Sequence, residues 1–179
     1  MVVIKGGDKL AAALAEISQK VTRAASVEVG FLKGALYDDG TSVAMVAAIQ
    51  EFGAPKVGIP PRPFFRTMVK EKSPEWPDAI GDLLVANGYD AEKTLGKTGE
   101  AIKGQLQEAI SDTFEPPLSQ VTLMLRKMRA DDPSLVVTGK TVAEARKRVA
   151  DGEIPSGVST KPLVDSGHLL DSVDYNVKS

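Results

Sequence analysis

The residues best suited to chemistry lie near the C-terminus, around the chain's one histidine, His168. A Ser-His-Asp arrangement would draw its nucleophile from Ser166 or Ser172 and its acid from Asp165 or Asp171. All of these residues are neighbours within one short turn. A working triad instead needs a nucleophile and a base held by separate rigid elements in front of an oxyanion site. The pattern predicts a surface or turn histidine, and we expect the protein not to be an enzyme.

Metal and cofactor chemistry is equally unsupported by the sequence. Two aspartate pairs, Asp38-Asp39 and Asp131-Asp132, lie in turn-like stretches, where adjacent aspartates usually cap or form the turn. A two-metal site needs acidic residues that converge from several elements. The Gly-Lys-Thr in "GKTGEAIKG" lacks the upstream glycine and the preceding strand of a phosphate-binding loop. We therefore expect no metal and no cofactor.

Two short basic clusters lie on predicted helices and offer a second kind of chemistry. One interpretation is a solvated helix face, since acidic residues flank both clusters. The other is a contact with phosphate or with an acidic partner surface. No aromatic residues interleave with the charges, so stacking on single-stranded nucleic acid is not indicated. The candidate residues are Arg126, Lys127, Arg129, Arg146, Lys147 and Arg148.

A rigid, aromatic and basic segment, "EFGAPKVGIPPRPFFRTM", runs from Glu51 to Met68. Residues that precede proline are pushed out of the helical region, so the segment favours an extended backbone that loses little entropy on ordering. One interpretation is a packed loop that leads into a helix. We favour a docking element that a neighbouring subunit receives, with Arg62 and one of the two phenylalanines at the interface rather than only in the core. The candidate interface residues are Ile59, Pro60, Arg62, Phe64, Phe65 and Arg66.

Composition narrows the class of protein further. The chain has 179 residues, a net charge of −2 and no cysteine, so a disulfide framework and thiolate metal sites are excluded. No apolar run approaches the roughly 20 residues that a membrane helix needs, and the N-terminus does not resemble a signal peptide. We expect a protein made in a reducing cytosol, with no membrane partner and no global charge that attracts DNA.

The periodicity of apolar residues predicts an α+β fold: a small, mostly antiparallel sheet covered on one face by helices, with a helical middle insertion. Ser42 and Asp90 are expected to cap helices, and Gly53 to end one. Asp8 is the expected cap of the first helix. Strands are expected at 1–5, 26–32 and 173–177, helices at 8–21, 43–52, 63–72, 78–87, 91–114, 118–130 and 141–152, and a helical turn at 165–172.

We expect a single domain, 1–179, with three consecutive parts. These are an N-terminal α/β part (1–72), a mainly helical middle with loops (73–160), and a C-terminal turn with a closing strand (161–179). The apolar side chains of that strand should face the same side as those of the strand at 26–32. Gly96, Gly99 and Gly104 each weaken the helix at 91–114 by about 1 kcal/mol relative to alanine, and they would be tolerated if another helix packed closely against them.

Three motifs in order resemble a family of tailed-bacteriophage morphogenesis proteins, the tail-completion or neck proteins. The first is "VGFLKGALYDDGTSVAMVAAIQEFG", an Ala-rich helix that ends in Glu-Phe-Gly, followed by "IPPRPFFRTM". The second is the entry to a helix, "PPLSQVTLMLRK", and the third is "KPLVDSGHLLDSVDYNV", from Lys161 to Val177. Ser166 stands where the family more usually has threonine. The "LVVTGKTVAEARKRVADGE" region follows no family pattern and suggests an insertion.

The resemblance implies a non-enzymatic virion protein, assembled in the bacterial host cytoplasm, that acts in tail completion and head–tail joining at the neck. It implies a homo-oligomeric ring, with a hexamer as the expected form. The implied neighbours are other neck and tail proteins: the connector or adaptor, the terminator and the tail tube. Two alternatives stay open. One is the tail terminator that caps the tail tube, and the other is a protein that contacts DNA in the exit channel through the basic clusters.

Overall fold

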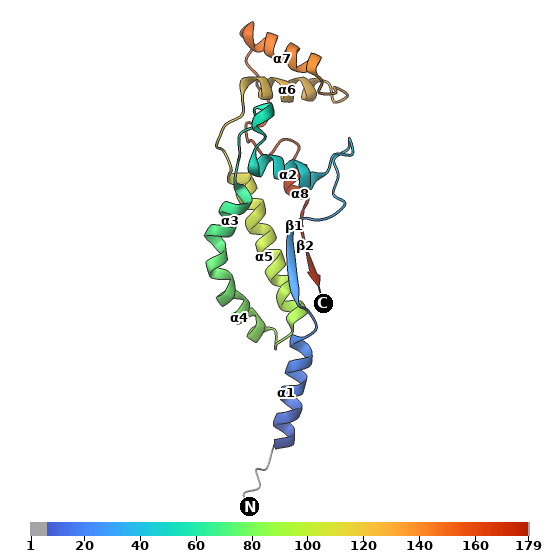
Figure 1. Cartoon of the computed structure of the whole chain (residues 1–179), viewed down its shortest axis with the longest axis vertical. Helices are drawn as coiled ribbons and strands as arrows, with labels where there is room; N and C mark the ends of the chain where they lie inside the picture. Colours follow the sequence, from blue (N-terminus) through green and yellow to red (C-terminus); the bar gives the residue numbers. More distant parts are fainter. Residues whose placement is uncertain (1–6, 179) are drawn as a thin grey trace, which may run out of the picture. The chain divides into compact units, whose positions relative to one another are not determined.

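The structure is a computed structural model that describes residues 7–178, and its chain folds into two compact units (Figure 1). Unit 1 comprises Met1–Gly34, Phe65–Gln107 and Val173–Ser179, and unit 2 comprises Ala35–Phe64 and Glu108–Ser172. The strand predicted at 1–5 lies outside the described residues. Each unit combines segments from both halves of the chain. The single domain, 1–179, with three consecutive parts stays a prediction.

The fold is α+β, as the sequence predicts. Unit 1 contains β1 and β2, which form a two-stranded antiparallel sheet, together with helices. Its elements are α1 (Gly7–Val21), β1 (Ser26–Phe31), most of α3 (Phe64–Lys72), the 3₁₀ turn η2 (Ser73–Glu75), α4 (Trp76–Ala86), the first part of α5 (Ala91–Asp112), and β2 (Val173–Lys178).

The register of the sheet confirms the predicted alternation. Residues directly opposite each other in an antiparallel pair lie on the same face. All apolar side chains of the two strands therefore share one face, and the charged ones share the other. The apolar pairs are Val27↔Val177, Val29↔Tyr175 and Phe31↔Val173.

The apolar face of the sheet contacts α5 at a glycine. A Cβ placed on Gly99 would lie 2.8 Å from Cγ of Tyr175 and 2.9 Å from Cγ2 of Val27. No side chain larger than hydrogen fits there without movement. Gly99 therefore does have a close packing partner, and this partner is the sheet rather than another helix. Gly96 and Gly104 have nothing within 4 Å of such a Cβ.

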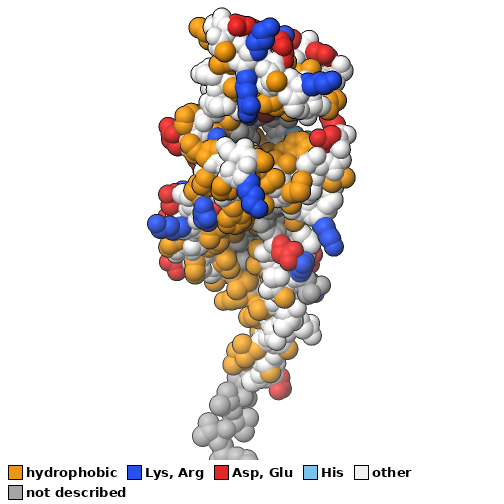
Figure 2. Space-filling model, turned by 45° about the horizontal axis from the view of Figure 1, so that its top comes forward, with side chains coloured by type: hydrophobic (Ala, Val, Ile, Leu, Met, Phe, Trp, Pro, Cys, Tyr) orange, Lys and Arg blue, Asp and Glu red, His pale blue; other side chains and the backbone are white. Residues whose placement is uncertain are grey.

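Helix α1 carries apolar residues at helical spacing, but its described residues include none that is buried. Leu10 is 63% exposed, Leu14 is 57% exposed and Val21 is 40% exposed. Figure 2 shows orange side chains exposed along this helix, at the lower end of the view. The helix is therefore amphipathic, and its apolar stripe stays largely exposed within the part of the chain that the structure describes.

Unit 2 is helical. It holds α2 (Val43–Phe52), the 3₁₀ turn η1 (Pro55–Val57), the end of α5, α6 (Gln120–Asp131), α7 (Gly139–Ala150) and the short α8 (His168–Asp171). Helices α6 and α7 pack on each other through Met124, Met128 and Ala145, which are buried. The region that follows no family pattern thus folds as α7 and contributes to a small core with α6.

The predicted caps are largely correct. Ser42 Oγ accepts from the Met45 N–H at 3.4 Å, Asp90 Oδ1 accepts from the Lys93 N–H at 3.0 Å, and Gly53 ends α2. Asp8 is wrong as a cap, because α1 begins at Gly7 and places Asp8 in its first turn. Phe114 also departs from the prediction, because α5 ends at Asp112 and leaves that ring 54% exposed.

Among the residues that the structure describes, no helix has both the length and the hydropathy needed to cross a membrane.

We predict that Gly99→Ala lowers the free energy of unfolding of unit 1 by about 1–3 kcal/mol, because the added methyl group overpacks the contact with Tyr175 and Val27. Gly96→Ala is the matched control on the same helix, and it should raise stability by up to about 1 kcal/mol. Urea unfolding followed by Trp76 fluorescence measures both, since the Trp76 Nε1–H donates to Gln105 Oε1 of α5 at 3.0 Å. A Gly99→Ala protein as stable as the Gly96→Ala protein would contradict the close approach.

Candidate functional site

The rigid segment after α2 forms a closed loop, residues 52–61, that we call the docking loop. Ala54 N–H donates to Ile59 O at 2.8 Å, and Ile59 N–H donates to Ala54 O at 3.2 Å. The turn η1 fills the tip between them. Gly53 has a φ of 75°, and a Cβ there would lie 2.8 Å from Pro61 N. Glycine at the end of Glu-Phe-Gly is thus required both by the backbone angle and by the close approach of the backbone at Pro61.

Arg62 anchors the end of the docking loop to unit 2. Its Nε–H donates to Pro116 O at 3.0 Å, and its NH1 donates to Gln50 Oε1 at 3.0 Å. Its backbone N–H donates to Gln50 O at 2.7 Å. Burial lowers the pKa of the Arg62 guanidinium, and the positive charge of Arg126 lowers it further. The loop therefore leaves α2 and returns to it through one buried arginine.

This geometry changes the expectation for two of the candidate interface residues. Arg62 and Phe64 are each only 3% exposed within their own chain. Arg62 forms hydrogen bonds within its own chain, and Phe64 belongs to the core. Both observations favour the interpretation of a packed loop that leads into a helix. Phe65 is half-buried and Arg66 is exposed. Pro60 is exposed and Ile59 is half-buried, so the interface remains a prediction for this outer part of the segment.

The docking loop itself presents apolar groups to the surface. Phe52 is 66% exposed and Val57 is 72% exposed. Pro55, Pro60 and Pro61 are exposed as well. Neither Phe52 nor Val57 was among the sequence candidates. Their exposure could have been predicted from their position, because apolar side chains in a turn bounded by glycine and proline have no core to face.

Arg126 is the second buried anchor. Its NH1 donates to three carbonyl oxygens, those of Ser159 at 2.7 Å, Lys161 at 2.9 Å and Val164 at 3.3 Å. Its NH2 donates to Pro162 O at 3.2 Å.

The fifth contact of Arg126 is an ion pair, in which Nε lies 3.3 Å from Asp165 Oδ1. The Arg126 side chain is only 10% exposed. Burial lowers the pKa of its guanidinium, although the carboxylate of Asp165 partly opposes this. Arg126 thus holds the loop that leads to α8 and is not available to a phosphate.

The other predicted basic residues divide into paired and exposed ones. Lys127 Nζ lies 3.0 Å from Asp131 Oδ2, and Arg148 Nε lies 3.1 Å from Glu144 Oε1. Both pairs have i,i+4 spacing on a helix. These contacts agree with the solvated helix face. Three residues, Arg129, Arg146 and Lys147, are exposed. The six residues therefore do not act as one uniform basic surface.

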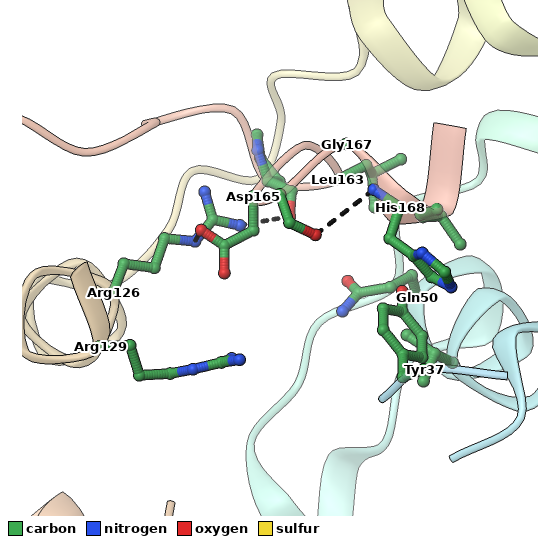
Figure 3. A pocket seen from close by; sticks show the side chains of 12 residues that line it. Tyr37, Gln50, Arg126, Arg129, Leu163, Asp165, Gly167 and His168 are labelled. Carbon is green, nitrogen blue, oxygen red and sulfur yellow. Dashed lines mark hydrogen bonds and ion pairs between the residues drawn. The ribbon is translucent and has the colours of Figure 1, made fainter. Parts of the chain in front are cut away.

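A pocket of about 250 Å³ lies in unit 2 between α2, α6 and the loop before α8 (Figure 3). Arg129 extends toward the space that Gln50 and Tyr37 border, while Asp165 lies beside Arg126. Burial raises the pKa of the Tyr37 phenol, and the carboxylates of Asp165 and Asp39 add to this rise. The lining residues are Tyr37, Val46, Gln50, Arg126, Arg129, Pro162, Leu163, Asp165, Ser166, Gly167, His168 and Leu169.

His168 has a structural role in this pocket. Its Nε2 lies 3.0 Å from Leu36 O, and since a carbonyl only accepts, Nε2 carries the proton in this arrangement. The ring also contacts Tyr37, with 4.7 Å between the ring centroids. Asp165 is paired with Arg126, and Ser172 Oγ donates to the backbone oxygen of His168. The contacts of the described residues do not bring a serine, the imidazole and an aspartate together as a triad.

The aspartate pairs also have local roles. Asp39 Oδ1 accepts from the Thr41 N–H at 2.9 Å, and hydrogen bonds from the Thr41 side chain and then from its backbone lower the pKa of Asp39. Asp132 Oδ1 accepts from the Ser134 N–H at 3.0 Å. Both are turn contacts of the kind the sequence predicts. No group of three or more potential metal ligands occurs among the residues that the structure describes.

Comparison of the chain with protein-family models, with curated proteins and with solved structures finds no match.

We predict that Arg126→Lys lowers the free energy of unfolding of unit 2 by about 2–3 kcal/mol, because an ammonium group cannot reproduce a fork that serves four carbonyls and a carboxylate. Arg129→Lys, on the same helix and exposed, is the control and should change stability by less than about 0.5 kcal/mol. Hydrogen exchange of residues 159–165 reports the effect locally. Equal exchange in the two variants would contradict the anchoring role.

We also predict that Arg62→Ala destabilises unit 2 by about 2–3 kcal/mol, since it leaves the Pro116 carbonyl and the Gln50 amide without their buried donor. This reverses the sequence-based expectation of an interface residue whose loss spares the fold. Arg66→Ala, at an exposed position of the same segment, should cost less than about 1 kcal/mol. Thermal unfolding of the isolated proteins compares them, and an unchanged melting temperature for Arg62→Ala would refute the anchor.

Proposed function

We propose that this chain is a non-enzymatic structural subunit of a tailed-bacteriophage neck, which acts in tail completion and head–tail joining as a homo-oligomeric ring. The observation that carries the proposal is the docking loop, a stiff and internally bonded segment that exposes Phe52 and Val57. The order of the three sequence motifs supplies the class of particle. Within this proposal a hexameric ring is the expected form, and the neck of the virion is the expected location.

The physical character of the docking loop suits fixed contacts between subunits. Its two internal backbone hydrogen bonds and its prolines set its shape before binding, so little conformational entropy is lost when it docks. Aromatic anchors on a preorganised element are typical of residues that dominate binding energy. An exposed phenylalanine and valine on one short loop therefore favour an assembly role over a chemical one.

Helix α1 provides independent support for an assembly. It has 15 residues, and its described residues include none that is buried. A helix of this length is marginal in water without tertiary packing. Its exposed Leu10 and Leu14 would gain stability from a second protein surface.

The alternative of a DNA-contacting protein is less well supported. Arg126 is buried and committed to carbonyls, and Lys127 and Arg148 form ion pairs on their own helices. The tail terminator remains the nearest alternative, because it also requires a ring.

The test is the mass of the purified protein in solution, measured with and without tails from the phage that encodes it. We expect a ring alone or on the tails, and Val57→Glu should weaken its association at least tenfold, or about 1.4 kcal/mol. Val136→Glu is the control, because Val136 is 71% exposed but lies outside the docking loop. Both variants should keep the melting temperature of the parent. A protein that stays monomeric with tails present, or equal effects of the two substitutions, would reject the proposal.

A further inference from the structure

The pocket of unit 2 gathers hydrogen-bond donors from three separate parts of the chain (Figure 3). Arg129 comes from α6, Gln50 from α2, and Tyr37 from the segment before α2. Arg129 extends toward the space that Gln50 and Tyr37 border. All three residues belong to unit 2, so one compact unit builds the pocket. None of the lining residues belongs to the docking loop, so the pocket is a second candidate binding site.

The guanidinium of Arg129 is the positive charge that the pocket has available. Among the described residues, Arg129 forms neither a hydrogen bond nor an ion pair. The neighbouring Arg126 is instead paired with Asp165 and bonded to four carbonyls. Hydrogen bonds from Thr41 lower the pKa of Asp39, and the charge of Arg129 lowers it slightly further. A guanidinium presents five N–H donors in a planar fork that matches a carboxylate.

Gln50 and Tyr37 add neutral donors. Gln50 Oε1 accepts from Arg62 NH1 at 3.0 Å, which fixes the orientation of the amide and leaves its Nε2 as a donor. Neither this Nε2 nor the Tyr37 hydroxyl forms a hydrogen bond among the described residues. Neither atom is fully enclosed, because every fully buried side-chain nitrogen or oxygen of the described residues has a partner. The Tyr37 ring is held by its contact with His168, at 4.7 Å between centroids.

The charge and size of the pocket favour a ligand with one negative charge. Asp165 balances Arg126, so Arg129 supplies the remaining positive charge. A phosphate group carries about −1.5 to −2 charge at pH 7 and would face the Asp165 carboxylate without a second available cation. The volume of about 250 Å³ lies below the roughly 300–1,000 Å³ of pockets for drug-sized ligands. Val46 and Leu163 provide apolar lining for a short stem.

We infer that this pocket binds a carboxylate carried on a short aliphatic stem. Arg129 pairs with the carboxylate oxygens, and Gln50 Nε2 and the Tyr37 hydroxyl donate to them. Two sources carry this group: a glutamate side chain of a partner protein, and a small free aliphatic acid. The inference does not depend on the proposed ring, because the docking loop takes no part in the pocket.

Titration of the full chain with butyrate at constant ionic strength tests the inference. The readout is the set of NMR signals from the Gln50 side-chain amide and the Arg129 Nε–H. We expect both to shift saturably, with a Kd on the order of 1–10 mM for one ion pair and two neutral hydrogen bonds to a small ligand. Butyramide has a similar shape without the charge, and it should bind at least tenfold more weakly. Inorganic phosphate should also bind at least tenfold more weakly.

Three variants assign the binding to the pocket. Arg129→Gln removes the charge and the fork, and it should weaken butyrate binding at least tenfold. Arg146→Gln is the matched control, because Arg146 is exposed on α7 and does not line the pocket, and its effect should stay below about twofold. Tyr37→Phe keeps the ring but loses the hydroxyl, and it should weaken binding about threefold to tenfold. All three proteins should keep the melting temperature of the parent.

Two peptides separate the sources of the carboxylate. Binding of acetyl-Ala-Glu-Ala-amide at least as tight as that of butyrate, without binding of acetyl-Ala-Gln-Ala-amide, would identify a partner's side chain. Binding of butyrate alone would identify a free acid, and both results support the inference.

Four results would overturn the inference. They are the absence of saturable binding by butyrate and by the glutamate peptide, equal affinities of Arg129→Gln and Arg146→Gln, equal affinities for butyrate and butyramide, and tighter binding of phosphate than of butyrate. None of them would change the mass measured for the ring, so the proposed function is tested separately.

Discussion

The supply of hydrogen-bond donors to proline-rich loops is the constraint on which unit 2 depends. Proline contributes a carbonyl but no N–H, so proline-rich segments have fewer backbone donors than acceptors. Two buried guanidinium groups supply the missing donors. Arg62 donates to the Pro116 carbonyl, and Arg126 donates to the Pro162 carbonyl and to those of three nearby residues. Each brings several acceptors to one centre, which the five donors of an arginine allow and the compact ammonium of a lysine does not.

Placing two guanidinium groups away from solvent disfavours their charged forms. Burial lowers the pKa of both guanidinium groups, and the charge of Arg126 also lowers the pKa of Arg62. Asp165 opposes the effect for Arg126 by pairing with its Nε at 3.3 Å. The Lys-Pro-Leu and Asp-Ser-Gly stretches near the C-terminus are therefore joined through one side chain on α6. Of the residues that resembled a triad and two basic clusters in the sequence, Asp165 and Arg126 belong to this anchor.

Local patterns made the secondary structure predictable, whereas side-chain partners were not. The caps at Ser42 and Asp90 and the shared apolar face of the strands follow from rules that act over a few residues. Arg126 bonds residues 33 to 38 positions away, and no local rule separates it from exposed Arg129 on the same helix. From the sequence, a close contact at Gly99 was only a condition under which a helix tolerates glycine. Its partner was not predictable, because a glycine can indicate a lack of space but does not identify the neighbouring side chain.

The same hydrogen bonds explain why apolar side chains of the docking loop can stay on the surface. Inside unit 2, the buried arginines satisfy the loop carbonyls, so the docking loop needs no further partner to hold its shape and can present Phe52 and Val57 outward. Inside unit 1, the apolar face of the sheet contacts α5 at Gly99. Apolar side chains on a stiff loop can stay exposed to water at modest cost, since scattered surface apolar groups are common.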